Sequence, residues 1–389
     1  MLPMDERHPS TVSDWDDARR RARLRETRIG HDWHRLRRTR LALLRVAALM
    51  LAVLIVVGYY WTADVNPERE RLARTRPSII AVNTPADPKN WDTVVVDMVG
   101  LGNLDATSTA AALPALDRIG MVWAIRYDNQ GIDTKVIADL IVRAAEQAAL
   151  KNIVLVGHSM GGVIALEVAK HIRNESDRRL VGVMLDCTPV DLNAVRPESR
   201  SAGEDLVRWA GWLPGARESR LLRILAETYA RRDRFLHVSP EGLPDIGFRE
   251  LRDVEVEILR DKILSRDVAS NGLIEAQFAA IVAGGAADDL RSLARPLDGK
   301  PRPAIIFIRP RDPDRDMVVD DEYSHRVLID ISGGVNGTLL VVFTRTGGHA
   351  NPISRPVEYN DIIENQILPF IQRYQLQMRN ASGNAAGPH

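Results

Sequence analysis

The chain has 389 residues, enough for one large α/β domain with additions or for two modest domains. Its 52 basic and 52 acidic residues cancel, so no overall positive field indicates a nucleic-acid partner. The single cysteine, Cys187, excludes an intrachain disulfide framework and a multi-cysteine metal site.

The N-terminal region has a strong local charge asymmetry followed by an apolar segment. Residues 19–40 carry ten arginines against Glu26 and Asp32, and residues 41–61 are apolar apart from Arg45. The apolar segment ends in Tyr-Tyr-Trp, and such aromatic residues are typical of membrane interfaces. A helix of this length spans about 30 Å of hydrocarbon. The sequence therefore predicts one transmembrane helix over the apolar segment.

This prediction divides the N-terminal region into three parts. Residues 1–40 form a basic tail, residues 41–61 the transmembrane helix and residues 62–77 a linker to the globular part. Because positive residues are retained in the cytoplasm, we expect the tail inside and the globular part outside. A buried core helix is one alternative, but such a helix usually has a polar face. A cleaved signal peptide is the other, but no convincing small-x-small site follows the apolar segment.

From residue 78 onward, short β-branched runs alternate with helical periodicity. This alternation is typical of a mainly parallel sheet with helices on both faces. Residues 134–150 place apolar side chains at helical spacing and predict a crossover helix between the third and fourth strands. Strands are predicted at seven places, which are Ser78–Val82, Thr93–Met98, Val122–Arg126, Asn152–Val156, Leu180–Leu185, Ala304–Ile308 and Leu339–Phe343.

The strand pattern stops between the fifth and sixth predicted strands. Residues 188–300 contain helical patterns but no convincing strand, so we predict a helical cap inserted into the sheet domain. The core of the domain is then residues 78–187 and 301–375, with a final helix over residues 357–374. Residues 376–389 are expected to form a disordered tail.

A serine lies between two glycines where the fourth predicted strand meets a predicted helix. The motif Gly-His-Ser-Met-Gly covers residues 157–161 and directly follows the apolar segment 152–156. Gly157 and Gly161 lack the bulk that would keep strand and helix apart, and the turn between them exposes Ser159 as a nucleophile. An ordinary glycine-rich turn is the alternative, but the buried strand before the motif and the amphipathic helix after it favour the nucleophile.

Residues from about 78 to 374, with GHSMGG at their centre, resemble the α/β-hydrolase superfamily, including its lipases, esterases and peptidases. The resemblance implies the α/β-hydrolase fold and a catalytic triad in the chain order serine, acid, histidine. A serine hydroxyl needs a neighbouring base, and the family's position for it falls on His349, after the last predicted strand and a Gly-Gly pair. His158 adjoins Ser159, but on this turn its side chain is expected to point away and to be structural.

The family usually supplies the acid after the penultimate strand, where this sequence has five aspartates. Asp316 is preferred because it begins Asp-Met-Val-Val, a pattern in which hydrophobic residues after the acid pack the loop down. Asp314 remains the close competitor. Asp186 ends the preceding strand, a position that some members of the fold use instead. We expect most of the remaining acids to be solvated loop charges, and these are Asp312, Asp320 and Asp321.

Acyl transfer also needs donors for the developing oxyanion. The resemblance implies the backbone N–H of Met160, the residue after the nucleophile, and a second donor from the loop that follows the second predicted strand. Relatives often have His-Gly in that loop, whereas this chain has Val99-Gly100, and Leu101 is the matching donor. The departure leaves the shape of the acyl pocket open. No metal and no organic cofactor are required by this chemistry.

These features predict a membrane-anchored serine hydrolase that cleaves a carboxylic ester or lipid-type acyl substrate through an acyl-enzyme. A peptidase, amidase or thioesterase of the same fold is an open alternative. A tethered binding module without turnover is another, because a fold alone does not establish a function. The membrane, reached through residues 41–61, and a small-molecule or lipid ester are the expected partners, and no pattern defines an oligomeric state.

Overall fold

The computed structural model describes residue 20, residues 22–23 and residues 28–385, with gaps at 239–243, 266–267, 298 and 336. The chain divides into two compact units, residues 1–63 and residues 64–389. Most of the predicted basic tail lies outside the described residues.

Helix α2, Arg28–Tyr60, is the main element of the first unit. It begins within the predicted basic tail and includes most of the predicted transmembrane segment. Every side chain from Leu36 to Tyr59 is exposed, and an 18-residue window of the apolar stretch has a mean hydropathy of 2.7 with none of it buried. By length and composition this helix is able to cross a membrane, although a signal sequence has the same character.

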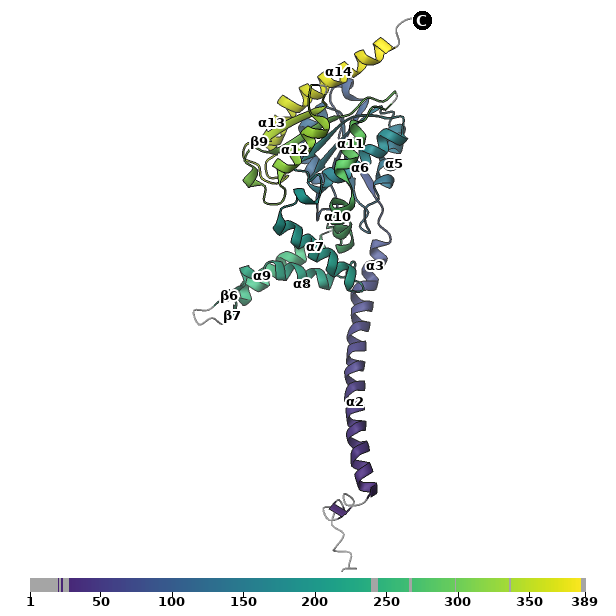
Figure 1. The fold of residues 1–389 in the computed structure, drawn as a ribbon, viewed down its shortest axis with the longest axis vertical. Coiled ribbons are helices and arrows are strands. Elements are labelled where there is room, and N and C mark those ends of the chain that lie inside the picture. Colours follow the sequence, from purple (N-terminus) through teal and green to yellow (C-terminus); the bar gives the residue numbers. More distant parts are fainter. Residues whose placement is uncertain are drawn as a thin grey trace, which may run out of the picture. The chain divides into compact units, whose positions relative to one another are not determined.

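The second unit is built on a seven-stranded sheet (Figure 1). The strand order is β1-β3-β2-β4-β5-β8-β9, and all neighbours are parallel except the antiparallel pair β1 and β3. The seven predicted strands are confirmed, and each end lies within two residues of its predicted place. The strands are β1 Ser78–Asn83, β2 Thr93–Met98, β3 Met121–Arg126, β4 Asn152–His158, β5 Arg179–Asp186, β8 Ala304–Pro310 and β9 Leu339–Thr344.

Burial explains why these strands have near-continuous apolar sequences. All residues of β2, β4 and β8 are buried, because helices cover both faces of a parallel sheet. The edge strand β1 has no fully buried residue, which agrees with its antiparallel pairing at the border of the sheet. Strand β4 occupies the centre, with three strands on each side, so the turn that follows it lies in the middle of the sheet edge.

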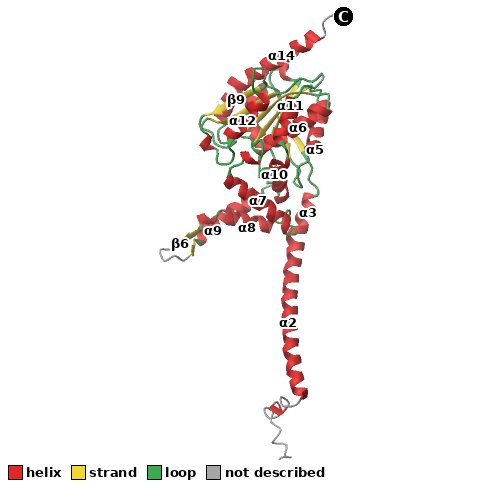
Figure 2. Cartoon of the chain, in the orientation of Figure 1, coloured by secondary structure: helices red, strands yellow, loops and turns green. Residues whose placement is uncertain are grey.

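Helices form a layer on each face of the sheet (Figure 2). In one layer α5, α6, α11 and α12 pack against one another in succession, and in the other α4, α13 and α14 contact the strands. The predicted crossover helix corresponds to α5. The bounds are α4 Thr107–Ala112, α5 Thr134–Gln147, α6 Met160–Glu175, α11 Ala286–Ala294, α12 Asp321–Ser332, α13 Pro356–Ile362 and α14 Leu368–Ala385.

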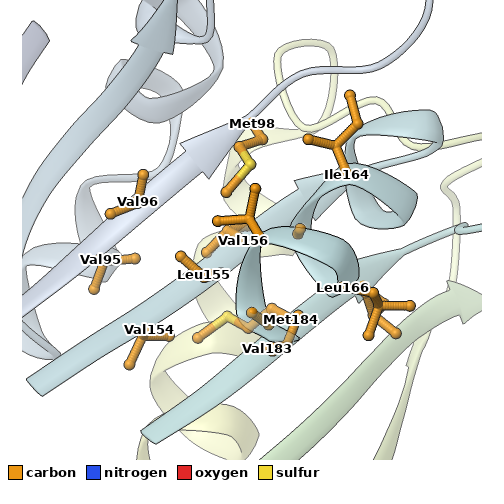
Figure 3. Close-up of a cluster of buried hydrophobic side chains, with 14 of the residues drawn as sticks. Val95, Val96, Met98, Val154, Leu155, Val156, Ile164, Leu166, Val183 and Met184 are labelled. Atoms are coloured by element: carbon orange, nitrogen blue, oxygen red, sulfur yellow. The ribbon is translucent and has the colours of Figure 1, made fainter. Parts of the chain in front are cut away.

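The hydrophobic core lies between the central strands and α6. Figure 3 shows buried side chains of β2, β4 and β5 together with two of α6. Successive strand residues point to opposite faces of the sheet, so alternate residues meet α6 and hold the helix, with the turn at its beginning, against the sheet. The labelled residues are Val95, Val96, Met98, Val154, Leu155, Val156, Ile164, Leu166, Val183 and Met184.

The chain between β5 and β8 is mostly helical, as the sequence predicts. It contains α7 Pro197–Trp212, α8 Arg220–Ala230, α9 Phe248–Ile258 and α10 Asn271–Ala283, followed by α11 beside the sheet. One feature differs from the expectation, because β6 Leu236–Val238 and β7 Pro244–Ile246 pair as an antiparallel hairpin. Each of these strands has three residues, which is too short for a pattern of alternating polarity to be recognised.

The C-terminal helix also extends beyond its predicted end. After α13 and a short π-helical segment, α14 continues to Ala385, so residues 376–385 are helical where the sequence predicted disorder. No proline lies between Pro369 and Pro388, so every residue between them has the backbone N–H that a helix uses. Residues 386–389 lie outside the described residues.

Candidate active site

Ser159 occupies a strained turn between β4 and α6. Its φ of 54° and ψ of −124° place a non-glycine residue in a region that side chains normally avoid, at a cost of about 1–3 kcal/mol. The backbone N–H of Ser159 donates to the carbonyl of Asp186 at 2.7 Å, and its own carbonyl accepts from Gly162 at 2.9 Å. The turn thus fixes the hydroxyl at the carboxyl edge of the sheet.

The two glycines of the motif permit two different close approaches. A Cβ atom at Gly157 would lie 2.5 Å from the backbone of Gly162, so this glycine lets α6 fold back on β4. A Cβ atom at Gly161 would lie 2.4 Å from the carbonyl oxygen of Met98, so this glycine lets α6 approach the end of β2. Both contacts are with backbone atoms, which cannot move aside.

Three predicted side chains meet at this edge. His349 lies in the loop after β9, and its Nε2 is 2.7 Å from the Ser159 Oγ. Its Nδ1 is 2.8 Å from Oδ2 of Asp316, which lies in the loop after β8. Because β4, β8 and β9 are parallel, their carboxyl ends bring these loops to the same edge. The arrangement is that of a nucleophile, a base and an acid that orients the base.

Asp316 is held as a carboxylate although it is fully buried. Burial raises the pKa of its carboxyl, but the hydrogen bond and charge of His349 and two backbone N–H groups outweigh burial, so the pKa is below its usual value. Those N–H groups belong to Val318 and Val319 and donate to Oδ1 at 2.8 and 2.9 Å. Val319 is buried as predicted for a loop that packs down, whereas Met317 is exposed.

The structure separates Asp316 from its competitors. Asp314 is exposed, and its own backbone N–H donates to Asp312, so its carboxylate is not part of the hydrogen-bonded series. Asp320 caps α12 by accepting from the N–H of Tyr323 at 3.0 Å. Asp186, the substitute position, binds His158 rather than His349.

Asp321 is not the solvated loop charge that the sequence predicted. Its side chain is fully buried at the start of α12, where the chain turns back to the sheet. Burial raises the pKa of Asp321, and the neighbouring negative charge of Asp316 raises it further, to about 9. Asp321 is therefore a neutral carboxylic acid near pH 7, next to an acid that is ionised. The sequence conceals this because burial depends on how the loop packs.

His158 has a structural environment, as expected. Its Nδ1 is 2.8 Å from Asp186 and its Nε2 forms an ion pair with Asp97 at 3.1 Å. Asp186 also accepts a hydrogen bond from the hydroxyl of Tyr359 at 3.0 Å. Burial lowers the pKa of His158, but the two carboxylates outweigh burial and raise the pKa to about 10. A buried imidazolium therefore joins β4 to its neighbours β2 and β5.

The predicted oxyanion donors belong to two segments next to Ser159. Met160 is the first residue of α6, and Leu101 follows Gly100 in the loop after β2. A Cβ atom at Gly100 would lie 2.9 Å from the carbonyl oxygen of His158 and 3.1 Å from the Cβ of Ser159, so this loop passes directly against the nucleophile. Among the described residues, neither predicted N–H donates to a backbone acceptor outside its own element.

Cys187 is the remaining functional group beside the predicted triad. Its sulfur, a carboxylate oxygen of Asp316 and a ring nitrogen of His349 lie within 4.8 Å of one another. Burial raises the pKa of the Cys187 thiol well above its usual value, so the group is protonated, and both nitrogens of His349 already have partners. A protonated thiol and a histidine whose two nitrogens already have partners are poor metal ligands, so this cluster favours proton transfer over metal binding.

A family model described as "Alpha/beta hydrolase family" matches residues 53–362. The chain belongs to the alpha/beta hydrolase family. The mainly parallel seven-stranded sheet with helices agrees with the fold of this family, as the sequence resemblance implies. Among curated protein sequences, none matches the chain.

Several solved structures are similar to this chain. A monoacylglycerol lipase of Paleococcus ferrophilus has 14% identity and a TM-score of 0.47, with 77% of this chain and 99% of that chain covered. An esterase from Exiguobacterium antarcticum has 14% identity and a TM-score of 0.45, covering 76% and 94%. A proline iminopeptidase of Mycobacterium smegmatis has 13% identity and a TM-score of 0.44, covering 79% and 98%. At these identities the structures indicate no substrate for this hydrolase.

Sequence reasoning missed Asp97 and Gln277. Asp97 is the one charged residue in the apolar strand Thr-Val-Val-Val-Asp-Met, and a charge in such a strand is itself a signal of a buried partner. Gln277 is fully buried in the apolar helix α10 and contacts the loop after β2. Its polarity within an apolar run is a comparable signal.

We expect Asp316→Asn to lower kcat by about 10⁴-fold, because the amide no longer fixes the tautomer of His349. Asp314→Asn should leave kcat within about twofold, because Asp314 is exposed and outside the hydrogen-bonded series. The kcat of the two variants is measured by ester hydrolysis, and thermal denaturation checks that both are folded. A severe loss in Asp314→Asn alone would move the acid by two residues.

The hydrolase should lose stability as the pH rises from about 6.5 to about 10. The folded pKa of His158 is raised to about 10, so its ion pairs contribute fully below the unfolded pKa of about 6.5 and are lost as the pH approaches 10. His158→Gln should lower the thermal midpoint at pH 6.5 and flatten its decline with pH, and the ionisation of Asp321 contributes to the slope that remains. Parallel pH profiles of the two proteins would contradict this assignment.

Proposed function

We propose that this chain is a membrane-anchored serine hydrolase that cleaves a carboxylic ester or lipid-type acyl substrate through an acyl-enzyme intermediate. The observation that carries the proposal is the continuous series of Ser159 Oγ, His349 and Asp316, with both distances under 3 Å. A strained turn that presents a hydroxyl to a base is costly to maintain, and nucleophilic catalysis explains why it is retained.

Each member of the triad has a defined step. His349 Nε2 takes the proton of Ser159 as Oγ bonds to the substrate carbonyl carbon, and Asp316 stabilises the imidazolium through Nδ1. The imidazolium then gives its proton to the departing alcohol oxygen as the bond between carbon and that oxygen breaks. A water molecule then attacks the acyl carbon as His349 takes one of its protons. The imidazolium returns that proton to Ser159 Oγ as the bond between the acyl carbon and Oγ breaks, which releases the carboxylic acid.

An oxyanion forms during acylation and again during deacylation, and it needs hydrogen-bond donors that are already in place. We assign this role to the backbone N–H groups of Met160 and Leu101. Removing one such donor typically costs about 2.7–4 kcal/mol of transition-state stabilisation. The donors are main-chain groups, so the replacement of the His-Gly common in relatives by Val99-Gly100 leaves this function intact.

Residues 188–300 are proposed as a cap that bounds the substrate site. Helices α8 and α9 of this segment expose large apolar side chains, among them Leu225, Tyr229 and Phe248. Such surfaces suit a lipid or an apolar ester better than a charged substrate. Combined with the proposed membrane anchor, they favour an acyl substrate that partitions into or near a bilayer.

Two alternatives make different predictions. A peptidase, amidase or thioesterase would use the same triad, and ester, amide and thioester substrates with a common acyl group distinguish them by kcat/KM. A tethered binding module would show no turnover with any of them. The intact hydrogen-bonded triad argues against a module without turnover.

We expect Ser159→Ala to abolish ester hydrolysis and labelling by a fluorophosphonate probe while the thermal midpoint stays close to that of the wild type. The change removes one oxygen from a turn whose shape depends on its glycines. Gly161→Val should have the opposite profile, with a large loss of folded protein, because its side chain would collide with the Met98 carbonyl. A folded Ser159→Ala protein that retains the wild-type rate would exclude the mechanism.

We further propose that the apolar segment remains as an uncleaved signal anchor, with the N-terminus cytoplasmic and the hydrolase domain outside. Residues 19–40 carry ten arginines against two acids, whereas residues 62–77 carry four arginines against three acids. Positive residues are retained inside, so the larger excess sets the orientation. The exposed apolar surface of α2 supports a bilayer environment for this segment.

A reporter that is active only outside the cytoplasm, fused after His389, should be active. The mature protein should stay in the membrane fraction at its full mass. Activity of a cytoplasmic reporter at the same position would reverse the orientation. A soluble product shortened by about 60 residues would instead identify the segment as a cleaved signal peptide.

A further inference from the structure

We infer that Gln277 is a positioning residue that holds the oxyanion loop, residues 99–103, in its productive place beside Ser159. The inference rests on the proposed function, since a loop can be productive only if the chain performs acyl transfer. Gln277 lies on α10, within the proposed cap, and its side chain is fully buried. It therefore links the cap to the catalytic edge of the sheet.

Both ends of the Gln277 amide bind the backbone of this loop. Its Oε1 accepts a hydrogen bond from the N–H of Gly102 at 2.8 Å, and its Nε2 donates to the carbonyl of Asn103 at 2.8 Å. A buried amide is costly unless both its donor and its acceptor have partners, and here each has one. These two hydrogen bonds fix the positions of Gly102 and Asn103, and they involve only the backbone of the loop.

The loop itself is a tight turn. The N–H of Asn103 donates to the carbonyl of Gly100 at 3.3 Å, and Gly102 has a φ of +82°, as the third residue of a type II turn requires. The side-chain amide of Asn103 also donates to the carbonyl of Leu101 at 3.3 Å. The peptide group between Leu101 and Gly102 is thus held at its carbonyl by Asn103 and at its N–H by Gln277.

The position of this turn matters for catalysis because the turn lies directly beside the nucleophile. Gly100 packs directly against Ser159, and the next N–H along the chain is the proposed donor of Leu101. A displacement of about 1 Å at a catalytic group can reduce a rate by about 10²-fold. Among the described residues, the hydrogen bonds of Gln277 go to the loop and not to the triad, so its influence acts through the loop.

The segment that carries Gln277 is itself fixed to the core. Ser270 caps α10 by accepting from the N–H of Leu273 at 3.0 Å, and its own N–H donates to Asn129 at 2.6 Å. Asn129 follows β3 and also donates to the carbonyl of Val268 at 3.2 Å. Helix α10 packs against α6, the helix that begins at the nucleophile. The loop, the cap helix and the nucleophile turn therefore form one connected group.

The test compares Gln277→Met with Asn271→Leu in the full-length protein. Methionine has nearly the shape of glutamine but cannot bind the loop. Asn271 is the matched control, because it is also an α10 amide that donates to backbone carbonyls, at Ala216 and Ser219, and these lie away from the oxyanion loop. The measurements are kcat and KM for a short-chain p-nitrophenyl ester, the inhibition constant of a trifluoromethyl ketone and the thermal midpoint.

We expect Gln277→Met to lower kcat about 10- to 100-fold, with KM changed less than about threefold. The trifluoromethyl ketone forms a tetrahedral adduct with an oxyanion, so its inhibition constant should rise by about the same factor as kcat falls. Asn271→Leu should keep both constants within about threefold. A role confined to stability would instead lower the thermal midpoints of both variants and leave both constants unchanged.

Gln277→Glu supplies a conservative rescue. A protonated carboxyl can accept from Gly102 and donate to Asn103, but the ionised form has no donor for the Asn103 carbonyl. The ratio of its kcat/KM to that of the wild type should therefore be highest at low pH and fall as the pH rises. A folded Gln277→Met with wild-type kcat and inhibition constant overturns this inference alone. A wild type without turnover or probe labelling overturns the proposed function and this inference with it.

Discussion

The strained turn at Ser159 is the constraint on which the rest of the site depends. It exists because α6 lies so close to β4 and β2 that only glycine is accommodated at Gly157 and Gly161. The strain costs about 1–3 kcal/mol and is offset by the burial of α6 among apolar strand residues. The hydrogen bond to the Asp186 carbonyl adds a second restraint. Every other site residue is useful only if it reaches this one turn.

The carboxyl edge of the sheet concentrates buried acids, and each is accommodated differently. Asp97 and Asp186 share the imidazolium of His158. Asp316 is stabilised by His349 and by backbone N–H groups, which hold its pKa below the usual value despite burial. Within the described part of the chain, Asp321 has no comparable donor, and its pKa is raised instead. Environment, not residue type, thus decides which acid remains ionised to orient the base.

The loop after β2 connects this electrostatic arrangement to the proposed cap. It passes against Ser159 at Gly100 and is bound two residues later by Gln277 from α10. A segment distant in sequence therefore contacts this edge through hydrogen bonds from the Gln277 side chain to the backbone of the loop. In the proposed function, these bonds give the cap a physical route to influence the reaction in addition to bounding the substrate.

The sequence alone predicted the strands and the turn at Ser159, because each depends on local signals: apolar runs and glycines at fixed spacing. The family resemblance added His349, after a Gly-Gly pair beyond the last strand, and the region of the acid, within which only the pattern Asp-Met-Val-Val separated Asp316 from Asp314. The tertiary structure alone decided that Asp321 is buried and that Gln277 meets the oxyanion loop. These contacts join residues far apart in the chain, and burial and pKa follow from the groups that folding brings together, which no local pattern encodes.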